Sequence, residues 1–169
     1  MAVERYITPE SALVESKLLY RADADFDDDD KPFTRLTELH IRTVQRRTTL
    51  GSDKKLTAFA WEKIPGATWG KLSTKTGDYG WFPNADPCFR TKLVAGENFP
   101  PGVATTKLAA WQHCLKSVKA RLKRAKEHSY GEDYENDVIA LIALVERRIS
   151  AERSAKTKNK QAVAGPASS

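Results

Sequence analysis

The strongest constraint on the fold is a regular apolar spacing in the C-terminal half of the chain. Apolar residues recur three and four positions apart from residue 108 to 125, and this spacing gives a helix one buried face. These positions are Leu108, Trp111, Leu115, Val118, Leu122 and Ala125. A second such face follows the helix-breaking residues 129–131, at Tyr134, Val138, Leu141, Ile142, Val145 and Ile149. The spacing predicts an antiparallel helical hairpin over residues 105–153, with Thr105 or Thr106 as its N-cap.

Short β-prone segments separated by turn residues occupy residues 36–87. Two sets of side chains alternate in residues 39–44 and again in residues 56–61, as on strands with two differently packed faces. Residues 68–73 and 78–82 flank Gly77, which tolerates the positive φ of a tight hairpin loop. This pattern predicts a small β-barrel.

The same region carries a tryptophan at the start of a strand, a Gly-x-x-Gly turn and an aromatic-aromatic-Pro stop. These are Trp69, Gly77 with Gly80, and the sequence Trp81-Phe82-Pro83. The order resembles the Src-homology-3 family in its bacterial variety, and the resemblance implies an SH3-like small β-barrel over residues 36–87. Aromatic grooves bind polyproline helices, so Trp69, Tyr79 and Trp81 are candidate partner-binding residues. Aromatic residues at alternating strand positions also form barrel cores, and both interpretations stay open.

The remaining segments complete an α+β organisation. Thr8, Pro9 and Glu10 suit the first turn of a helix, which predicts a short N-terminal helix within residues 1–22. An acidic linker is expected over residues 23–35 and a loop over residues 88–104, because both are poor in apolar periodicity. Residues 154–169, rich in Lys, Ala and Ser, are expected to form a disordered basic tail.

Opposite charges are segregated along the chain, whose net charge is +6. Six aspartates lie between residues 23 and 30, whereas residues 105–128 contain five lysines and two arginines against Glu127 alone. Six more cations occur in residues 147–160 against Glu152. Such asymmetry indicates a nucleic-acid or other polyanion partner, or an acidic arm that folds over a basic face; simply solvated charge is the alternative. The candidate nucleic-acid-binding residues are Arg42, Arg46, Arg47, Lys116, Lys119, Lys123, Arg124 and Lys126.

Catalytic and metal-binding patterns are lacking in the sequence. The three histidines are far apart, and His113 and Cys114 are adjacent helix positions whose side chains point about 100° apart. The two cysteines have no partners at zinc-ligand spacing and are expected to be reduced thiols. We therefore expect no catalytic residue, no cofactor and no metal. No apolar run is long enough to span a membrane and the first residues lack a secretory signal, so a cytoplasmic or host-cytoplasmic location is expected.

Two function classes fit these features. The first is a non-enzymatic nucleic-acid or polyanion binder that uses the basic helix face and the barrel arginines. The second is a protein-interaction adaptor or inhibitor, of the kind that viruses and mobile elements encode, which docks a partner through the barrel aromatics or the helical hairpin. Binding by the first class weakens steeply with salt, whereas an apolar contact responds little.

Overall fold

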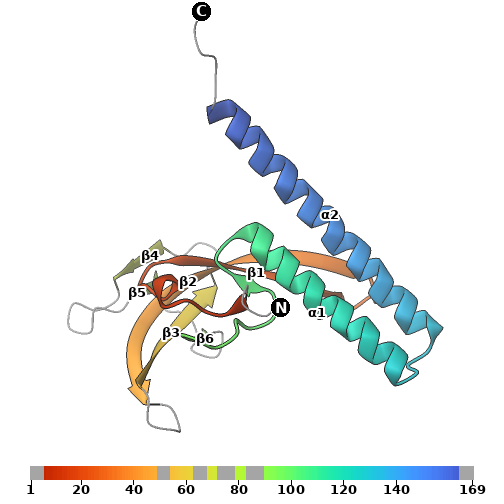
Figure 1. The fold of residues 1–169 in the computed structure, drawn as a ribbon, viewed down its shortest axis with the longest axis horizontal. Helices are drawn as coiled ribbons and strands as arrows, with labels where there is room; N and C mark the ends of the chain where they lie inside the picture. Colours follow the sequence, from red (N-terminus) through yellow and green to blue (C-terminus); the bar gives the residue numbers. More distant parts are fainter. Residues whose placement is uncertain (1–5, 49–53, 63–67, 72–78, 83–89, 164–169) are drawn as a thin grey trace, which may run out of the picture.

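The chain has a mixed α+β fold built on an antiparallel sheet. The computed structural model describes residues 6–48, 54–62, 68–71, 79–82 and 90–163. Five strands form an open sheet in the order β6-β3-β2-β1-β7, and a separate two-stranded sheet is formed by β4 and β5. Two helices, α1 and α2, follow the strands and pack together on one face of the sheet (Figure 1). The predicted α+β class is confirmed.

Strands β1 (Leu18–Phe26) and β2 (Pro32–Thr48) form a long hairpin at the N-terminal end of the chain. Alternate residues of β1 pack toward the helices, from Tyr20 through Ala22 and Ala24 to Phe26. The Asp27 carboxylate closes the turn by accepting hydrogen bonds from the backbone N–H groups of Asp29 and Lys31, at 3.0 and 2.8 Å. The predicted N-terminal helix and acidic linker are therefore wrong. A 3₁₀ turn, Glu10–Ala12, lies before β1 in place of the predicted helix, because the period-two alternation of β1 prevails over the local helix-start signal.

The distal half of β2 continues the sheet toward β3 (Lys54–Glu62) and β6 (Arg90–Val94). A register shift between Ile41 and Thr43 marks a bulge, past which β2 pairs only with β3. Strands β4 (Thr68–Lys71) and β5 (Tyr79–Phe82) pair antiparallel, as predicted for these two segments, with Trp69 opposite Trp81. Of the predicted barrel, β2 and β3 thus belong to a sheet that also contains β1 and β6. The resemblance to the Src-homology-3 family stays a prediction.

The predicted loop over residues 88–104 is wrong at both of its ends. Strand β6 lies in its first part, and β7 (Val103–Ala104) pairs with Arg21 and Tyr20 of β1. The apolar side chains of Leu93, Val103 and Ala104 are buried and explain why these short segments pack on the sheet rather than remain solvated.

Helices α1 (Lys107–Glu127) and α2 (Glu132–Val163) occur where the apolar spacing predicts them. Thr106 is the N-cap of α1, and its hydroxyl accepts a hydrogen bond from the Ala109 N–H at 3.2 Å. The expected disorder from residue 154 onward is wrong as far as Val163, because α2 continues to that residue.

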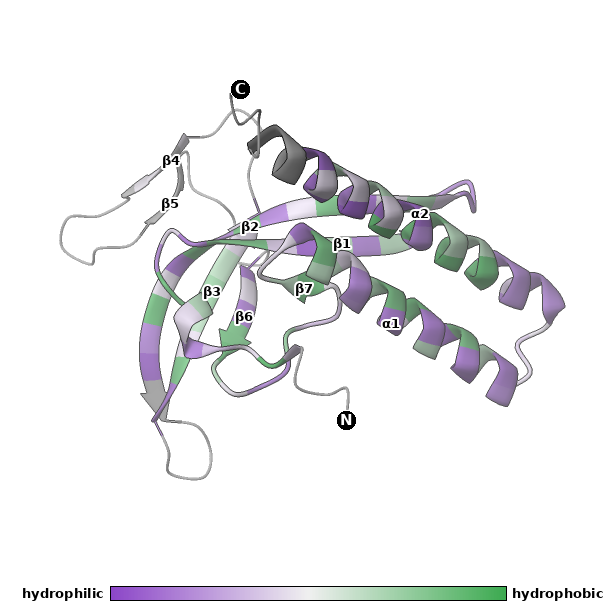
Figure 2. Cartoon of the chain, turned by 45° about the horizontal axis from the view of Figure 1, so that its top comes forward, coloured by the Kyte–Doolittle hydropathy of each residue, from purple (hydrophilic) through white to green (hydrophobic). Residues whose placement is uncertain are grey.

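Two apolar clusters lie on opposite faces of the sheet. One is formed with the N-terminal segment and the residues around Phe99, and its buried strand residues include Leu19, Leu39 and Ile41. The other lies between the sheet and the helices, where Trp111, Val118, Val138, Leu141, Val145 and Ile149 are buried. In Figure 2 the hydropathy colours of α1 and α2 change between hydrophobic and hydrophilic residues along both helices. Within the described residues, no helix has the length and apolar character needed to cross a membrane.

Candidate functional site

The helical pair has one end with mixed charge, which we call the turn end. Because α1 and α2 run in opposite directions, the last turn of α1 lies beside the first turn of α2 (Figure 1). Charged residues of both helices meet there: Lys123, Arg124, Lys126, Glu127, Glu132, Asp133 and Glu135. Lys123 pairs with Glu127 at 3.7 Å, and Arg121 nearby pairs with Asp25 of β1 at 3.2 Å. Acids at the start of α2 and cations near its end both suit the helix dipole.

The opposite end, which we call the open end, is predominantly basic. Besides Lys107 over the Tyr20 ring and Arg148 bonded to Thr34, the half of the helical pair from Lys119 and Glu146 outward carries six cations whose side chains are described, Lys116, Lys119, Arg147, Arg153, Lys156 and Lys158, against two carboxylates, Glu146 and Glu152. All six cations are exposed. Lys119 pairs with Glu146 at 3.2 Å, and the Lys116 ammonium lies 5.1 Å from the centre of the Tyr6 ring. Among the described residues, the other four cations have no carboxylate within ion-pairing distance.

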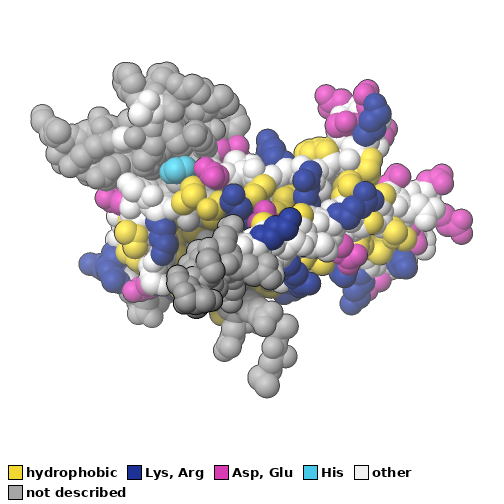
Figure 3. All heavy atoms as spheres, turned by 90° about the horizontal axis from the view of Figure 1, so that it is seen from above, with side chains coloured by type: hydrophobic (Ala, Val, Ile, Leu, Met, Phe, Trp, Pro, Cys, Tyr) yellow, Lys and Arg dark blue, Asp and Glu magenta, His cyan; other side chains and the backbone are white. Residues whose placement is uncertain are grey.

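Helix α2 is longer than its partner, and this places basic residues away from the body of the protein. It has 32 residues where α1 has 21, so its last part extends past the start of α1 (Figure 1). Each of residues 153–158 is exposed to solvent. Figure 3 shows acidic side chains gathered at the end of the molecule that holds the β1–β2 turn and the α1–α2 turn. Lys and Arg side chains lie across the middle of the face seen in this figure.

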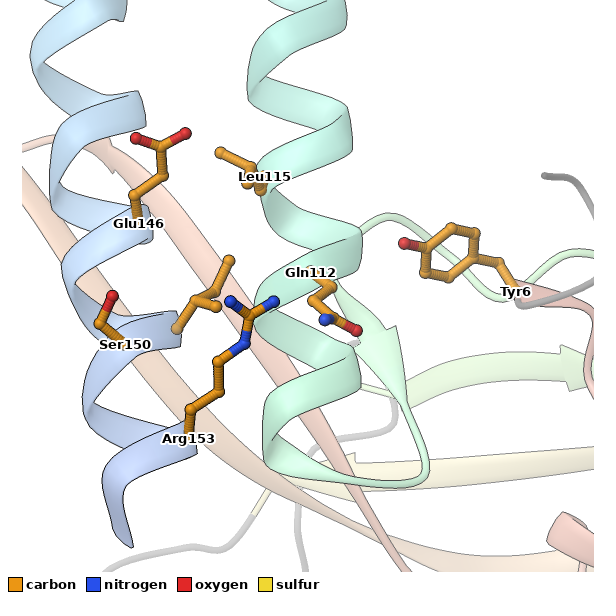
Figure 4. Close-up of a pocket in the computed structure, with 7 residues that line it drawn as sticks. Tyr6, Gln112, Leu115, Glu146, Ser150 and Arg153 are labelled. Carbon is orange, nitrogen blue, oxygen red and sulfur yellow. The ribbon is translucent and has the colours of Figure 1, made fainter. Parts of the chain in front are cut away.

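A groove of about 490 Å³ lies at the open end, between the outer surfaces of α1 and α2. Its floor is apolar, formed by the half-buried Leu115 and the buried Ile149. Around the floor are an amide, a hydroxyl, a carboxylate and a guanidinium group, from Gln112, Ser150, Glu146 and Arg153. In Figure 4 the Arg153 side chain points from α2 toward Gln112 on α1. The groove therefore offers both donors and acceptors over an apolar base.

Tyr6 completes the wall of the groove and is held by an aromatic contact. Its ring stacks on His113 with 4.1 Å between ring centres and 22° between planes. His113 Nδ1 lies 3.0 Å from the Val103 carbonyl oxygen. Burial lowers the pKa of His113, and the nearby positive charge of Lys116 acts in the same direction. A neutral imidazole at this position donates to Val103 and keeps Tyr6 in place.

The structure separates the two predicted sets of basic residues. Arg42 and Arg46 lie on β2 past its pairing with β1, whereas α1 packs against β1 and β7. Arg42 stacks over Trp61 with 5.0 Å to the ring centre, and Arg46 lies 3.8 Å from Glu10. Arg47 belongs to β2, but its side chain lies outside the described residues.

The predicted stripe on α1 is divided between the two ends of the helical pair. Lys116 and Lys119 belong to the open end, while Lys123, Arg124 and Lys126 belong to the turn end. The sequence did not predict that Tyr6, Gln112, Ser150 and Arg153 line one groove. The cations of residues 147–160 were the available signal, but only the antiparallel packing brings them beside α1.

The predicted aromatic residues and the cysteine thiol lie away from the groove or outside the described residues. Trp69, Tyr79 and Trp81 lie on β4 and β5, but their side chains are outside the described residues. Burial raises the pKa of Cys114 to about 12, which keeps its thiol protonated and unreactive. Within the described part of the chain, no group of three or more His, Cys, Asp or Glu side chains is placed to hold a metal ion.

Comparison of the chain with protein-family models, characterised proteins and solved structures gave no match.

Proposed function

We propose that this chain is a non-enzymatic protein that binds nucleic acid or another polyanion through the open end of its helical pair. The observation that carries the proposal is the set of six exposed cations named above, five of which lack a carboxylate partner among the described residues. Such cations release condensed counterions when they contact phosphates, and this release drives binding.

The turn end is a weaker candidate because carboxylates surround its cations. Lys123 is paired with Glu127, and the first turn of α2 adds three more acids beside Arg124 and Lys126. A phosphate approaching this end meets repulsion as well as attraction. Lys116 and Lys119 of the predicted set thus belong to the proposed surface, and Arg153, Lys156 and Lys158 join them.

Salt-dependent binding to oligonucleotides tests the proposal, with two triple variants that remove the same charge. The first variant, R153A/K156A/K158A, removes cations of the open end, and the second, K123A/R124A/K126A, removes cations of the turn end. Alanine preserves helix propensity in both. We expect the first variant to reduce the slope of log affinity against log salt by about 2 to 3, since each phosphate contact contributes roughly 0.7 to 0.9. We expect the second to change it by less than about 1.

A protein-interaction adaptor is the second candidate function. Its supporting observation is the β4–β5 pairing that sets Trp69 opposite Trp81, with Tyr79 on the same strand as Trp81. Absence of oligonucleotide binding by the intact chain at low salt would reject the polyanion proposal and favour this alternative. Equal losses in both triple variants would reject the assignment to the open end.

A further inference from the structure

The groove at the open end has a chemical character that phosphate contacts alone do not require. Its volume is about 490 Å³ and it is open to solvent, so it can hold a small flat group against one surface rather than enclose it. The apolar floor of Leu115 and Ile149 suits a flat ring, and the surrounding amide, hydroxyl and carboxylate suit the polar edge of that ring. We propose, on the basis of the proposed function, that this groove takes one unpaired base of a single-stranded nucleic acid.

The position of Glu146 favours a base over a phosphate inside the groove. One carboxylate oxygen of Glu146 accepts a hydrogen bond from Lys119 at 3.2 Å, which holds the carboxylate at the edge of the groove. A phosphate placed beside this carboxylate is repelled, whereas the amino groups of adenine, cytosine and guanine are hydrogen-bond donors that a carboxylate accepts. Gln112 supplies a donor and an acceptor for the same edge. The cations that contact the backbone, Lys116 and Lys156, are exposed outside the groove lining.

Arg153 is the group that stacks on the base. One face of Tyr6 is already covered by His113, so Tyr6 acts as a wall. The guanidinium of Arg153 is planar, exposed and without a carboxylate partner among the described residues, and it extends over the groove toward Gln112 (Figure 4). A guanidinium plane stacks on a base and can contact the adjacent phosphate. A base within a duplex is paired and stacked, so a duplex reaches only the cations around the groove.

A groove-filling substitution tests the inference without changing charge. Ser150 is exposed and lines the groove, whereas Ser154 is exposed one turn further along α2 and does not line it. In the full-length chain, we expect Ser150→Phe to weaken binding of single-stranded DNA and RNA about fivefold, a value typical of one stacked cation contact. Duplex affinity should stay unchanged, and the matched Ser154→Phe variant should bind both forms as the parent chain does.

A base analogue reports insertion directly. Single strands carrying 2-aminopurine should change their emission on binding to the parent chain and to Ser154→Phe, and this change should be lost with Ser150→Phe. The inference is overturned if Ser150→Phe leaves single-strand affinity unchanged or lowers single-strand and duplex affinity equally. If the parent chain binds neither form at low salt, the proposed function itself fails; if it binds both with steep salt dependence and only the Ser150→Phe effect is missing, the inference alone fails.

Discussion

Gly102 lies where the chain passes closest to β1, immediately before β7. Its φ is +75°, and a Cβ built on it would lie 2.1 Å from the Ala22 carbonyl oxygen and 3.2 Å from the Ala22 carbonyl carbon. Both atoms belong to the backbone, so no rotamer change relieves the contact. Substitution by alanine must therefore move β7 away from β1.

The cost of Gly102→Ala has two parts. Placing a non-glycine residue at positive φ costs roughly 1–2 kcal/mol. Movement of the strand also breaks the hydrogen bond from the Ala22 N–H to the Gly102 carbonyl, which spans 3.0 Å, and leaving a buried N–H without a partner costs about 1–3 kcal/mol. We expect a total loss of about 3 kcal/mol in the free energy of unfolding.

Gly96 provides the matched control because its φ is +78° and its Cβ would meet nothing within 4 Å. Gly96→Ala should therefore lower the free energy of unfolding only by the cost of positive φ, about 1 kcal/mol. Urea unfolding followed by circular dichroism measures both values, with the denaturant slope as a check that the unfolding transition is the same. Losses that agree within about 0.5 kcal/mol would show that backbone crowding at Gly102 contributes nothing, and the reasoning would be refuted.

Two further predictions concern α1. Ser129 has a φ of +53° in the motif that ends α1, which is closed by a hydrogen bond of 3.1 Å from the Tyr130 N–H to the Ala125 carbonyl. Because glycine adopts positive φ without strain, Ser129→Gly should raise the free energy of unfolding by about 0.5–1 kcal/mol. A lower midpoint of urea unfolding would contradict this. Because burial raises the pKa of Cys114 to about 12, its native thiol should react with iodoacetamide at pH 8 only as fast as the chain unfolds. That rate is measured with Cys88 replaced by serine, and labelling at the rate of a free thiol would disprove it.

The sequence predicts the parts of the fold whose stability is local or strictly periodic. The helices follow from the apolar spacing through Trp111 and Val145, and the strand character of β4 and β5 follows from the β-prone residues around Trp69 and Trp81. Strand β1 escaped prediction because its aspartates are poor strand formers. The fold compensates them through distant arginines: Arg35 of β2 lies 3.7 Å from Asp23, and Arg121 of α1 pairs with Asp25.

The candidate site was less accessible to sequence reasoning than the fold. The composition of residues 154–158 predicts disorder, because these residues have no apolar face to bury. Their helical state needs no new nucleation, because α2 is already formed and anchored by Val145 and Ile149. The groove depends on side chains from α1, α2 and the N-terminal segment, such as Gln112, Arg153 and Tyr6, and no local pattern links them.

Strand β2 contributes side chains to both apolar clusters, through the buried Leu39 and Ile41 on one face and the half-buried Leu36 on the other. Leu39 and His40 are also paired on both edges of β2, Leu39 with Leu19 and Glu62, and His40 with Leu18 and Trp61. A break at that point uncovers both hydrophobic layers at once. Unfolding of the central strand therefore exposes both apolar clusters and removes the sheet face on which α1 and α2 pack, and the open end and its groove are lost with it.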